Sequence, residues 1–414
     1  MGGGIMTKKI IFLTLIFCCF FANLSYASAR YKSDRIIVRL SDDKTSAGDS
    51  AKSQMLGTIG GSSIESEFKV VPGMLALKLP PGINVIDAVN KLNAAQGVLY
   101  AQPDYEMDVL STVPDDPRFN ELWGMYNSGA GGGKARADIH APEAWDLGTG
   151  SEDIIVAVID TGVDYTHPDL APNMWVNEAE KNGTTGVDDD NNGYVDDIYG
   201  YDFCNNDGDP KDDYFHGTHC AGTIGAVGNN TVGVAGVCWN VKIMALKFLS
   251  SSGSGYTSNA IKCVEYAKKM GAKLSSNSWG GGGYSQALKD AIDAAGAQGM
   301  LFVAAAGNSG TNNDTQPAYP GSYTSDCIIS VMATDNTDSK AYFSCYGHNS
   351  VDIAAPGVNI LSTFPTYKTS AISGSLTTYY STISGTSMAT PHIAGACALV
   401  WSRDPLLTGA QVKD

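Results

Sequence analysis

The sequence predicts an α/β fold with a mostly parallel central sheet, preceded by a smaller α+β unit. Three observations predict it. Continuous apolar runs such as Ile154–Ile159 are typical of strands buried on both faces of a parallel sheet. Such runs alternate with segments of helical spacing. The composition changes after a proline-containing linker, which places a domain boundary near residues 110–114. A chain of 414 residues accommodates two or three domains.

Residues 30–110 form the predicted α+β unit. We expect strands at Arg35–Leu40, Met74–Leu79 and Val98–Ala101, where short apolar segments are bounded by polar residues, Gly or Pro. The apolar residues of Val85–Leu92 recur at helical spacing and predict a helix.

Residues 111–414 form the predicted larger domain. Apolar runs predict buried strands, and small or amphipathic segments predict helices. The strands are Ile154–Ile159, Val241–Leu246, Met300–Ala306 and Ile328–Met332, and the helices are Ile261–Ala267 and Ser387–Trp401, the second packed inside the domain. No internal repeat of solenoid or propeller period is present.

Residues 1–29 are predicted to be a secretion signal. Lys8 and Lys9 precede an apolar run, Ile10–Phe21, that is too short to span a bilayer. Ala27-Ser28-Ala29 has the small-x-small pattern of a signal peptidase site. No later stretch has the length and apolarity of a transmembrane helix. We therefore expect a soluble protein secreted from the cell.

The net charge excludes some partners. Lys and Arg number 27 and Asp and Glu 43, so the net charge is 27 − 43 = −16. This argues against binding to nucleic acid by phosphate neutralisation and against binding to anionic membranes. The segment from Glu152 to Asp213 contains 17 acidic residues, and its basic residues are Lys181 and Lys211. Its net charge is therefore 2 − 17 = −15. The segment is either a solvated acidic face or a cation-binding region.

Seven cysteines remain once Cys18 and Cys19 leave with the signal. Because seven is odd, at least one thiol stays free or pairs with another chain. No CxxC spacing occurs, so a zinc site is not expected. A disulfide pairing does not follow from the sequence.

Three segments carry residues with catalytic chemistry, in the order Asp, His, Ser. Asp160 ends the Ile154–Ile159 run, where it is a ligand-facing carboxylate or a turn residue. His216 and His219 are a metal pair or include a buried structural histidine. Ser387 begins a helix, where the positive dipole end faces a developing anion. A nucleophilic serine requires a histidine base, and the histidine requires an orienting carboxylate.

Together these motifs resemble those of the subtilisin-like serine proteases, the subtilase family. The matching segments are Val158–Asp164 with His167–Leu170, His216–Thr223, and Gly385–His392. The resemblance covers about residues 112–405, and residues 30–110 resemble the family's inhibitory propeptide. It implies a subtilisin-like three-layer fold preceded by a ferredoxin-like propeptide domain.

The resemblance also implies catalytic roles. Ser387 matches the nucleophile, His216 the general base and Asp160 the orienting carboxylate. His219 matches a structural neighbour, which removes the metal-pair interpretation. Asn308, in the segment Ala304–Gly310, matches the side chain that donates to the oxyanion.

Substrate is expected to bind as an added β-strand between two glycine-rich edges. The residues implied by the resemblance are Gly253, Ser254, Gly255, Ser278, Trp279, Gly280, Ala305 and Gly307, with Ala318 near the floor of the primary pocket. No charged residue occurs in these segments. We therefore expect a broad preference for an apolar or aromatic residue before the scissile bond.

Two segments predict structural calcium. Asp188–Asp197 has oxygen ligands at alternate positions and a glycine at the sixth, as EF-hand loops begin. The twelfth position is Tyr199 rather than Glu, so another carboxylate must close the site. The candidate ligands are Asp188, Asp190 and Asn192, with Asp196 or Asp197 closing.

The second calcium site is implied by the resemblance. The loop Gly228–Val234 matches a calcium loop of the family, although it is one residue longer. The matching ligands are Asn230, Val232 and Val234, a carbonyl at Val227 or Gly228, and the carboxylates of Asp116 and Asp169.

The expected protein is a secreted, calcium-stabilised endopeptidase made as a self-processing precursor. Processing is expected between Asp108 and Pro114, the propeptide acts as an intramolecular inhibitor, and polypeptides are the substrates of a monomer. Family members usually continue with another helix and a hairpin beyond the position of Asp414, so the chain is expected to be a fragment. Cys220 is expected to be an inert buried thiol.

Two other classes of protein are alternatives. The first is a catalytically silent, secreted calcium-binding module, which the complete triad with Asn308 argues against. The second is a serine esterase of the α/β-hydrolase kind. It requires a GxSxG motif and the order Ser, Asp, His. The segment Gly385–Ala389 lacks that motif, and the order in this chain is Asp, His, Ser.

Overall fold

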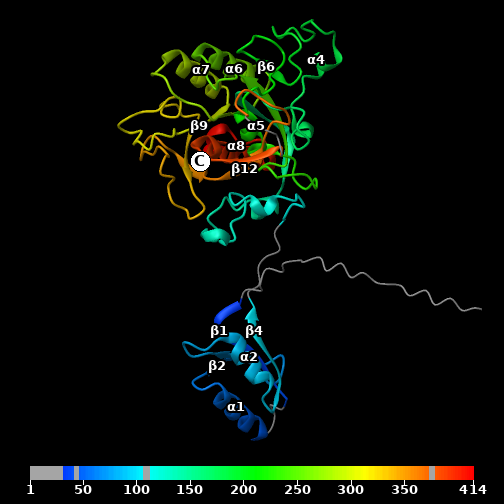
Figure 1. Cartoon of the computed structure of the whole chain (residues 1–414), viewed down its shortest axis with the longest axis vertical. Helices are drawn as coiled ribbons and strands as arrows, with labels where there is room; N and C mark the ends of the chain where they lie inside the picture. Colours follow the sequence, from blue (N-terminus) through cyan, green and yellow to red (C-terminus); the bar gives the residue numbers. More distant parts are fainter. Residues whose placement is uncertain (1–30, 42–45, 106–111, 373–377) are drawn as a thin grey trace, which may run out of the picture. The chain divides into compact units, whose positions relative to one another are not determined.

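The structure is a computed structural model that describes residues 31–41, 46–105, 112–372 and 378–414. The predicted signal, residues 1–29, lies outside the described residues, as does most of the predicted processing segment. The chain divides into two compact units, Met1–Leu110 and Ser111–Asp414 (Figure 1). In the described residues, no helix combines the length and the apolarity that crossing a membrane requires.

The smaller unit has the element order β-α-β-β-α-β, which is typical of ferredoxin-like folds. Its elements are β1 (Tyr31–Leu40), α1 (Ser46–Thr58), β2 (Ser63–Phe68), β3 (Met74–Lys78), α2 (Val85–Asn93) and β4 (Val98–Tyr105). The sheet is antiparallel in the order β2-β3-β1-β4. The sequence predicted β1, β3, α2 and β4 but missed α1 and β2.

Local sequence explains α2. The Asn84 side chain accepts hydrogen bonds from the backbone N–H groups of Ile86 and Asp87, which caps the helix. Val85, Val89 and Leu92 are buried at helical spacing and pack on the sheet. By contrast, every residue of β2 is exposed, so this strand lacks the alternating pattern that would have revealed it.

A seven-stranded parallel sheet forms the centre of the larger unit, and the predicted α/β class is confirmed. Its order is β11-β10-β9-β8-β5-β7-β6. The strands are β5 (Gly150–Asp160), β6 (Gly200–Asp202), β7 (Asn240–Lys247), β8 (Leu274–Asn277), β9 (Leu301–Ala305), β10 (Ile328–Thr334) and β11 (Ile353–Pro356), and β12 (Ile360–Thr363) pairs antiparallel with β13 (Tyr380–Ile383). The strands of the large sheet pair parallel throughout.

Helices cover both faces of this sheet. On one face, Val156 and Val158 of β5 pack with α5 (His216–Gly225) and α8 (Thr386–Arg403). On the other face, Ala157 and Ile159 pack with α6 (Thr257–Lys269) and α7 (Gln286–Ala297), which lie side by side in Figure 1. The shorter helices are α3 (Ala141–Trp145), α4 (Glu178–Asn182) and α9 (Gly409–Lys413). Because both faces are buried, β5 is a continuous apolar run.

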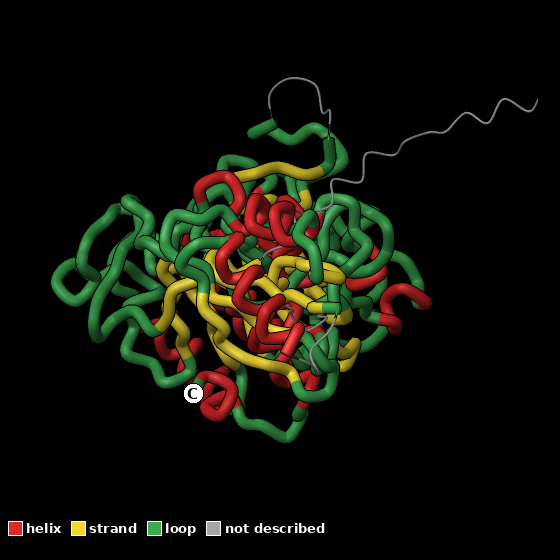
Figure 2. The backbone as a smooth tube through the Cα atoms, turned by 90° about the horizontal axis from the view of Figure 1, so that it is seen from below, coloured by secondary structure: helices red, strands yellow, loops and turns green. Residues whose placement is uncertain are grey.

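The strand order reverses at β5, since β7 lies on one side of it and β8 on the other. In open parallel sheets, ligands bind at the carboxyl ends of the strands beside such a reversal. Figure 2 shows that loops make up much of the chain. Two long loops, residues 203–215 before α5 and residues 306–327 after β9, follow the carboxyl ends of β6 and β9. The ends of β5 and β8 and these two loops therefore mark the place to search for a functional site.

Candidate active site

Asp160 is the last residue of β5 and is fully buried, with 0% of its surface exposed. Its Oδ1 atom accepts hydrogen bonds from the backbone N–H of Thr161 (2.7 Å) and from His216 Nδ1 (2.8 Å). Because an ionised carboxylate only accepts, the imidazole proton lies on Nδ1. The Nε2 atom of His216 is then the free acceptor of that ring.

His216 is the first residue of α5, and the glycine after it permits the contact with Asp160. A Cβ atom at Gly217 would lie 2.1 Å from the carbonyl oxygen of Gly162 and 3.1 Å from the Cβ atom of Asp160. Only glycine therefore allows the first turn of α5 to approach the end of β5 this closely.

Two opposing influences set the pKa of His216. Burial, the larger single influence, disfavours the imidazolium and lowers the pKa. The Asp160 carboxylate, together with the neighbouring Cys220, favours the charged form, and their sum raises the pKa well above the usual 6.5. The ring is thus prepared to accept a proton.

Ser387 is the second residue of α8. Its hydroxyl donates to the backbone carbonyl of Ser278 (2.9 Å), while the Ser278 hydroxyl donates to the Ser387 carbonyl (2.8 Å). These reciprocal bonds hold the start of α8 against the end of β8. Since the hydroxyl is bound to Ser278, it must rotate before it can transfer a proton to His216, as is common in ligand-free active sites.

The side-chain amide of Asn308 is oriented by Thr386. Its Oδ1 atom accepts from both the backbone N–H and the Oγ1 hydroxyl of Thr386, each at 2.9 Å. The Nδ2 donor is left as the group that is available to a ligand. Sequence reasoning missed this role of Thr386, whose only signal is a hydroxyl directly before Ser387.

All eight predicted substrate residues line one cleft of about 800 Å³ together with His216, Asn308 and Ser387. They are Gly253, Ser254, Gly255, Ser278, Trp279, Gly280, Ala305 and Gly307, and Ala318 lines it as well. Among the described residues that line the cleft, none is Asp, Glu, Lys or Arg. Its walls are aromatic: the rings of Phe248 and Trp279 meet at 4.8 Å, as do those of Tyr319 and Tyr323.

The residues of one predicted calcium site also lie together. Asp169 accepts from the side chain of Asn230 (2.8 Å) and the backbone N–H of Val234 (3.0 Å). Burial raises the pKa of Asp169 to about 6, and the charge of Asp116 adds to this effect. Asp116 accepts from the backbone N–H of Asn229 through Oδ2 (2.6 Å), while its buried Oδ1 has no partner among the described residues. An orphaned carboxylate oxygen beside a second carboxylate fits a divalent cation.

The predicted calcium loop of Asp188–Asp197 assembles differently from the expectation. Asp188 and Asp190 lie with Glu180 of α4, one oxygen atom of each within 4.8 Å of the others. The Asp197 carboxylate accepts instead from the side chains of Asn177, Asn192 and Tyr266.

The other predicted members of that loop are also bonded within the protein. Asp196 accepts from the backbone N–H of Gly186 (2.9 Å), and the Asn192 amide donates to Asp190 (3.1 Å). Glu180, which precedes the loop motif, is thus the carboxylate that joins Asp188 and Asp190. No spacing pattern in the sequence marks Glu180 as a ligand.

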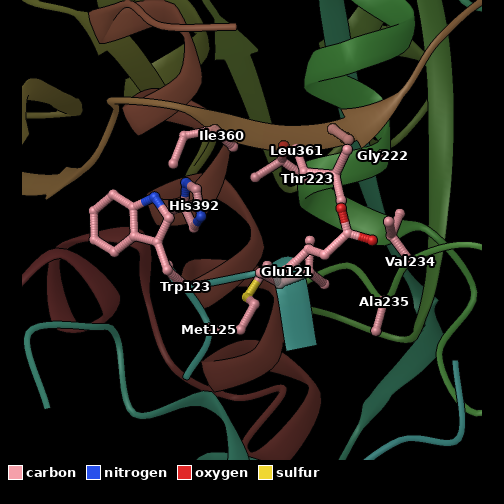
Figure 3. Close-up of a pocket in the computed structure, with 13 residues that line it drawn as sticks. Glu121, Trp123, Met125, Gly222, Thr223, Val234, Ala235, Ile360, Leu361 and His392 are labelled. Carbon is pink, nitrogen blue, oxygen red and sulfur yellow. The ribbon is translucent and has the colours of Figure 1, made fainter. Parts of the chain in front are cut away.

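Two further histidines are buried and neutral. Burial lowers the pKa of His219 to about 3, and its Nε2 contacts the carbonyls of Ile360 and Ser381 at 3.1 Å. Burial likewise lowers the pKa of His392 to about 4. His392 lines a small cavity of about 10 Å³ with Trp123 and Ile360 (Figure 3). That volume holds at most one water molecule, so the cavity is not a substrate site.

In the described part of the chain, all seven cysteines from Cys204 to Cys397 are free thiols. Cys220 lies beneath the histidine, with Sγ 4.0 Å from His216 Nδ1 and 3.5 Å from the Ser387 carbonyl oxygen. Burial raises the pKa of the Cys220 thiol, which keeps it in the unreactive protonated form.

Comparison with known families identifies this arrangement. A model of the subtilase family matches residues 151–414, and a model of the fervidolysin N-terminal prodomain matches residues 22–104. The chain belongs to the subtilase family. It is a serine protease with an N-terminal prodomain.

Relatives of this subtilase support the assignment. A thermophilic serine proteinase of Bacillus sp. (strain AK1) is 35% identical over 92% of this chain and 81% of its own length. Thermitase of Thermoactinomyces vulgaris is 40% identical over 64% of this chain and 80% of its own length. Among solved structures, a protease of Pseudoalteromonas arctica matches with a TM-score of 0.58 and 30% identity, over 73% of this chain and 91% of that one.

The pKa of His216 predicts the pH dependence of this subtilase. A general base must be neutral, so kcat/KM should be lost as pH falls through a raised pKa, with a midpoint above 6.5. Asp160→Asn removes the favourable charge; it should shift that midpoint downward and lower kcat by roughly 10⁴-fold. The measurement is kcat/KM on a peptide anilide from pH 5 to 9. An unshifted acid limb in Asp160→Asn would contradict the assignment of that limb to His216.

The amide of Asn308 predicts a second kinetic effect. Asn308→Ala should lower kcat by about 10²–10³-fold with little change in KM, because the lost donor acts on charge that develops in the transition state. Steady-state kinetics on the same substrate measure both constants. An increase in KM at constant kcat would assign Asn308 to ground-state binding instead.

Proposed function

We propose that this subtilase is a secreted endopeptidase that hydrolyses peptide bonds through an acyl-enzyme on Ser387. The observation that carries the proposal is the 2.8 Å contact between Asp160 and His216 in a cleft that also contains Ser387 and Asn308. The predicted signal, residues 1–29, supports secretion.

The proposed reaction uses each of these groups once. The Ser387 hydroxyl attacks the scissile carbonyl carbon and transfers its proton to His216 Nε2. Asn308 Nδ2 and the backbone N–H of Ser387 donate to the oxyanion of the tetrahedral intermediate. The imidazolium, held by Asp160, then protonates the leaving amine. Water, activated by the same imidazole, hydrolyses the acyl-enzyme.

Substrate is proposed to add a β-strand between Gly253–Gly255 and Ser278–Gly280, which lie on the cleft. The absence of Asp, Glu, Lys and Arg from the described lining residues supports a broad preference for apolar or aromatic residues before the scissile bond. The aromatic pair of Phe248 and Trp279 offers a large apolar contact surface in this cleft.

Calcium is proposed as a structural ligand at both acidic regions. Asp116 and Asp169 with the loop of Asn230 would hold one ion; Asp188 and Asp190, together with Glu180, would hold the other. Bound calcium supplies stability by binding only the folded state, about 4 kcal/mol at a thousandfold excess over Kd.

Self-processing is the first test of the proposal. We expect the chain without residues 1–29, expressed with calcium, to divide near residues 108–114, while Ser387→Ala stays intact because it lacks the nucleophile. Intact mass spectrometry measures both. Purification in the presence of an inhibitor of the host's own proteases controls for cleavage by those proteases.

Two results would contradict the proposal. Cleavage of Ser387→Ala at the same bond would show that another protease processes the chain. Failure of both proteins to divide and to hydrolyse casein, with circular dichroism typical of a folded protein, would favour the silent calcium-binding module.

Calcium removal is expected to destabilise the protein. Chelation should lower Tm by roughly 10 °C, the shift that about 4 kcal/mol produces in a domain of this size. Asp169→Asn and Asp190→Asn should each lose part of the calcium-dependent shift, since each removes a ligand from one site. Asp290→Asn, on the exposed face of α7, is the control for charge. A Tm that is independent of calcium in the parent chain would contradict both sites.

A further inference from the structure

Asp212 is a buried carboxylate that the reaction described above does not use. It lies in the loop before α5, four residues ahead of His216, and 0% of its surface is exposed. Its Oδ1 atom accepts from the Thr161 hydroxyl (2.9 Å) and the backbone N–H of Tyr214 (3.0 Å). Its Oδ2 atom accepts from the backbone N–H (2.9 Å) and the hydroxyl (2.6 Å) of Thr218. All four donors are neutral.

Three of these bonds join the two segments that carry Asp160 and His216, and the fourth, from Tyr214, lies within the loop of Asp212 itself. Thr161 directly follows Asp160, and its backbone N–H donates to the Asp160 carboxylate. Thr218 lies in the first turn of α5, two residues after His216. One oxygen of Asp212 therefore holds the end of β5, while the other holds the start of α5.

The hydrogen-bond directions require an acceptor at position 212. The Thr161 hydroxyl accepts from the backbone N–H of Gly217 (2.9 Å), and the Thr218 hydroxyl accepts from that of Asp164 (2.9 Å). Each hydroxyl proton is therefore free to point to Asp212. An ionised carboxylate accepts all four bonds, whereas an amide would direct its own N–H atoms at existing donors.

Burial destabilises the ionised form of this carboxylate. Desolvation raises the pKa of Asp212 to about 6, against the hydrogen bonds that lower it. The Tyr367 hydroxyl donates to the Asp212 backbone carbonyl (2.9 Å), which further fixes the loop. A buried charge with four neutral donors and no share in binding or proton transfer requires a reason for its presence.

We propose that Asp212 is a positioning residue for proton transfer: through Thr161 and Thr218 it sets the separation between the Asp160 carboxylate and the His216 imidazole. The proposal rests on the proposed roles of Asp160 and His216. It assigns Asp212 no contact with substrate, because Asp212 does not line the cleft.

Asp212→Asn tests the proposal with the size of the side chain unchanged. We expect kcat to fall about 10²-fold, the cost typical of a misplacement near 1 Å, with KM changed less than twofold. The control is Asp209→Asn, which makes the same charge change in the same loop. Asp209 is exposed and accepts only from the Tyr165 hydroxyl among the described hydrogen bonds, so this variant should retain the parent kcat.

The hydrogen-bonded Nδ1 proton of His216 provides a readout that is independent of turnover. Its downfield proton NMR signal should shift upfield in Asp212→Asn as the bond to Asp160 lengthens, and should be unchanged in Asp209→Asn. Thr218→Ser keeps the hydroxyl and should retain most of kcat, whereas Thr218→Val should lower it. Thr218→Val and Asp212→Asn should be non-additive, since both break the same bond.

Each outcome has one meaning. A parent-like kcat and NMR signal in Asp212→Asn would overturn the proposal. A loss of kcat with an unshifted signal and a lowered Tm would also overturn it, in favour of a merely structural role. If the parent and Asp209→Asn both hydrolyse no peptide, the proposed function fails, and the NMR signal still tests whether Asp212 positions His216.

Discussion

The structure of the site depends on one hydrogen bond, between the end of β5 and the start of α5. Asp160 and His216 are 56 residues apart in the chain and meet at 2.8 Å. β5 is held by parallel neighbours on both sides, which fixes Asp160. The approach of α5 requires two glycines: a Cβ atom at Gly217 would meet the Gly162 carbonyl at 2.1 Å, and one at Gly162 would meet the Pro210 carbonyl at 2.5 Å.

The carboxylates between residues 152 and 213 lie in different environments and have different roles. The composition of this segment alone allows two interpretations, a solvated acidic face or a cation-binding region. In the structure Asp160, Asp197 and Asp212 are buried, and their partners are hydroxyl, amide, imidazole and backbone N–H groups. Exposed carboxylates such as Asp190 and Asp209 lie at the surface. Neutral donors can stabilise a buried carboxylate because each bond to a charged group contributes more than a neutral one.

The sequence predicts those features that depend on residues close together in the chain. β5, β9 and α8 were predictable because buried parallel strands and a helix of small residues differ in composition from their surroundings. The polar helix α1 and the exposed strand β2 gave no such contrast. Within the site, Asp160, His216 and Ser387 were found through family motifs. Thr386, Glu180 and Asp212 were not, because their roles arise from contacts that form in the folded chain rather than from a sequence motif.

Charged residues are distributed unevenly around the cleft. The described walls carry no Asp, Glu, Lys or Arg, while Asp160 and Asp212 lie behind them. Under the proposed function, a polypeptide that enters the cleft meets backbone polar groups and aromatic rings rather than fixed charges, which suits recognition of main chain over side chain. An imidazolium that forms on His216 has the Asp160 carboxylate as its hydrogen-bonded counter-charge. Burial strengthens that attraction, so the charge that the proposed proton transfer creates on His216 is stabilised where it forms.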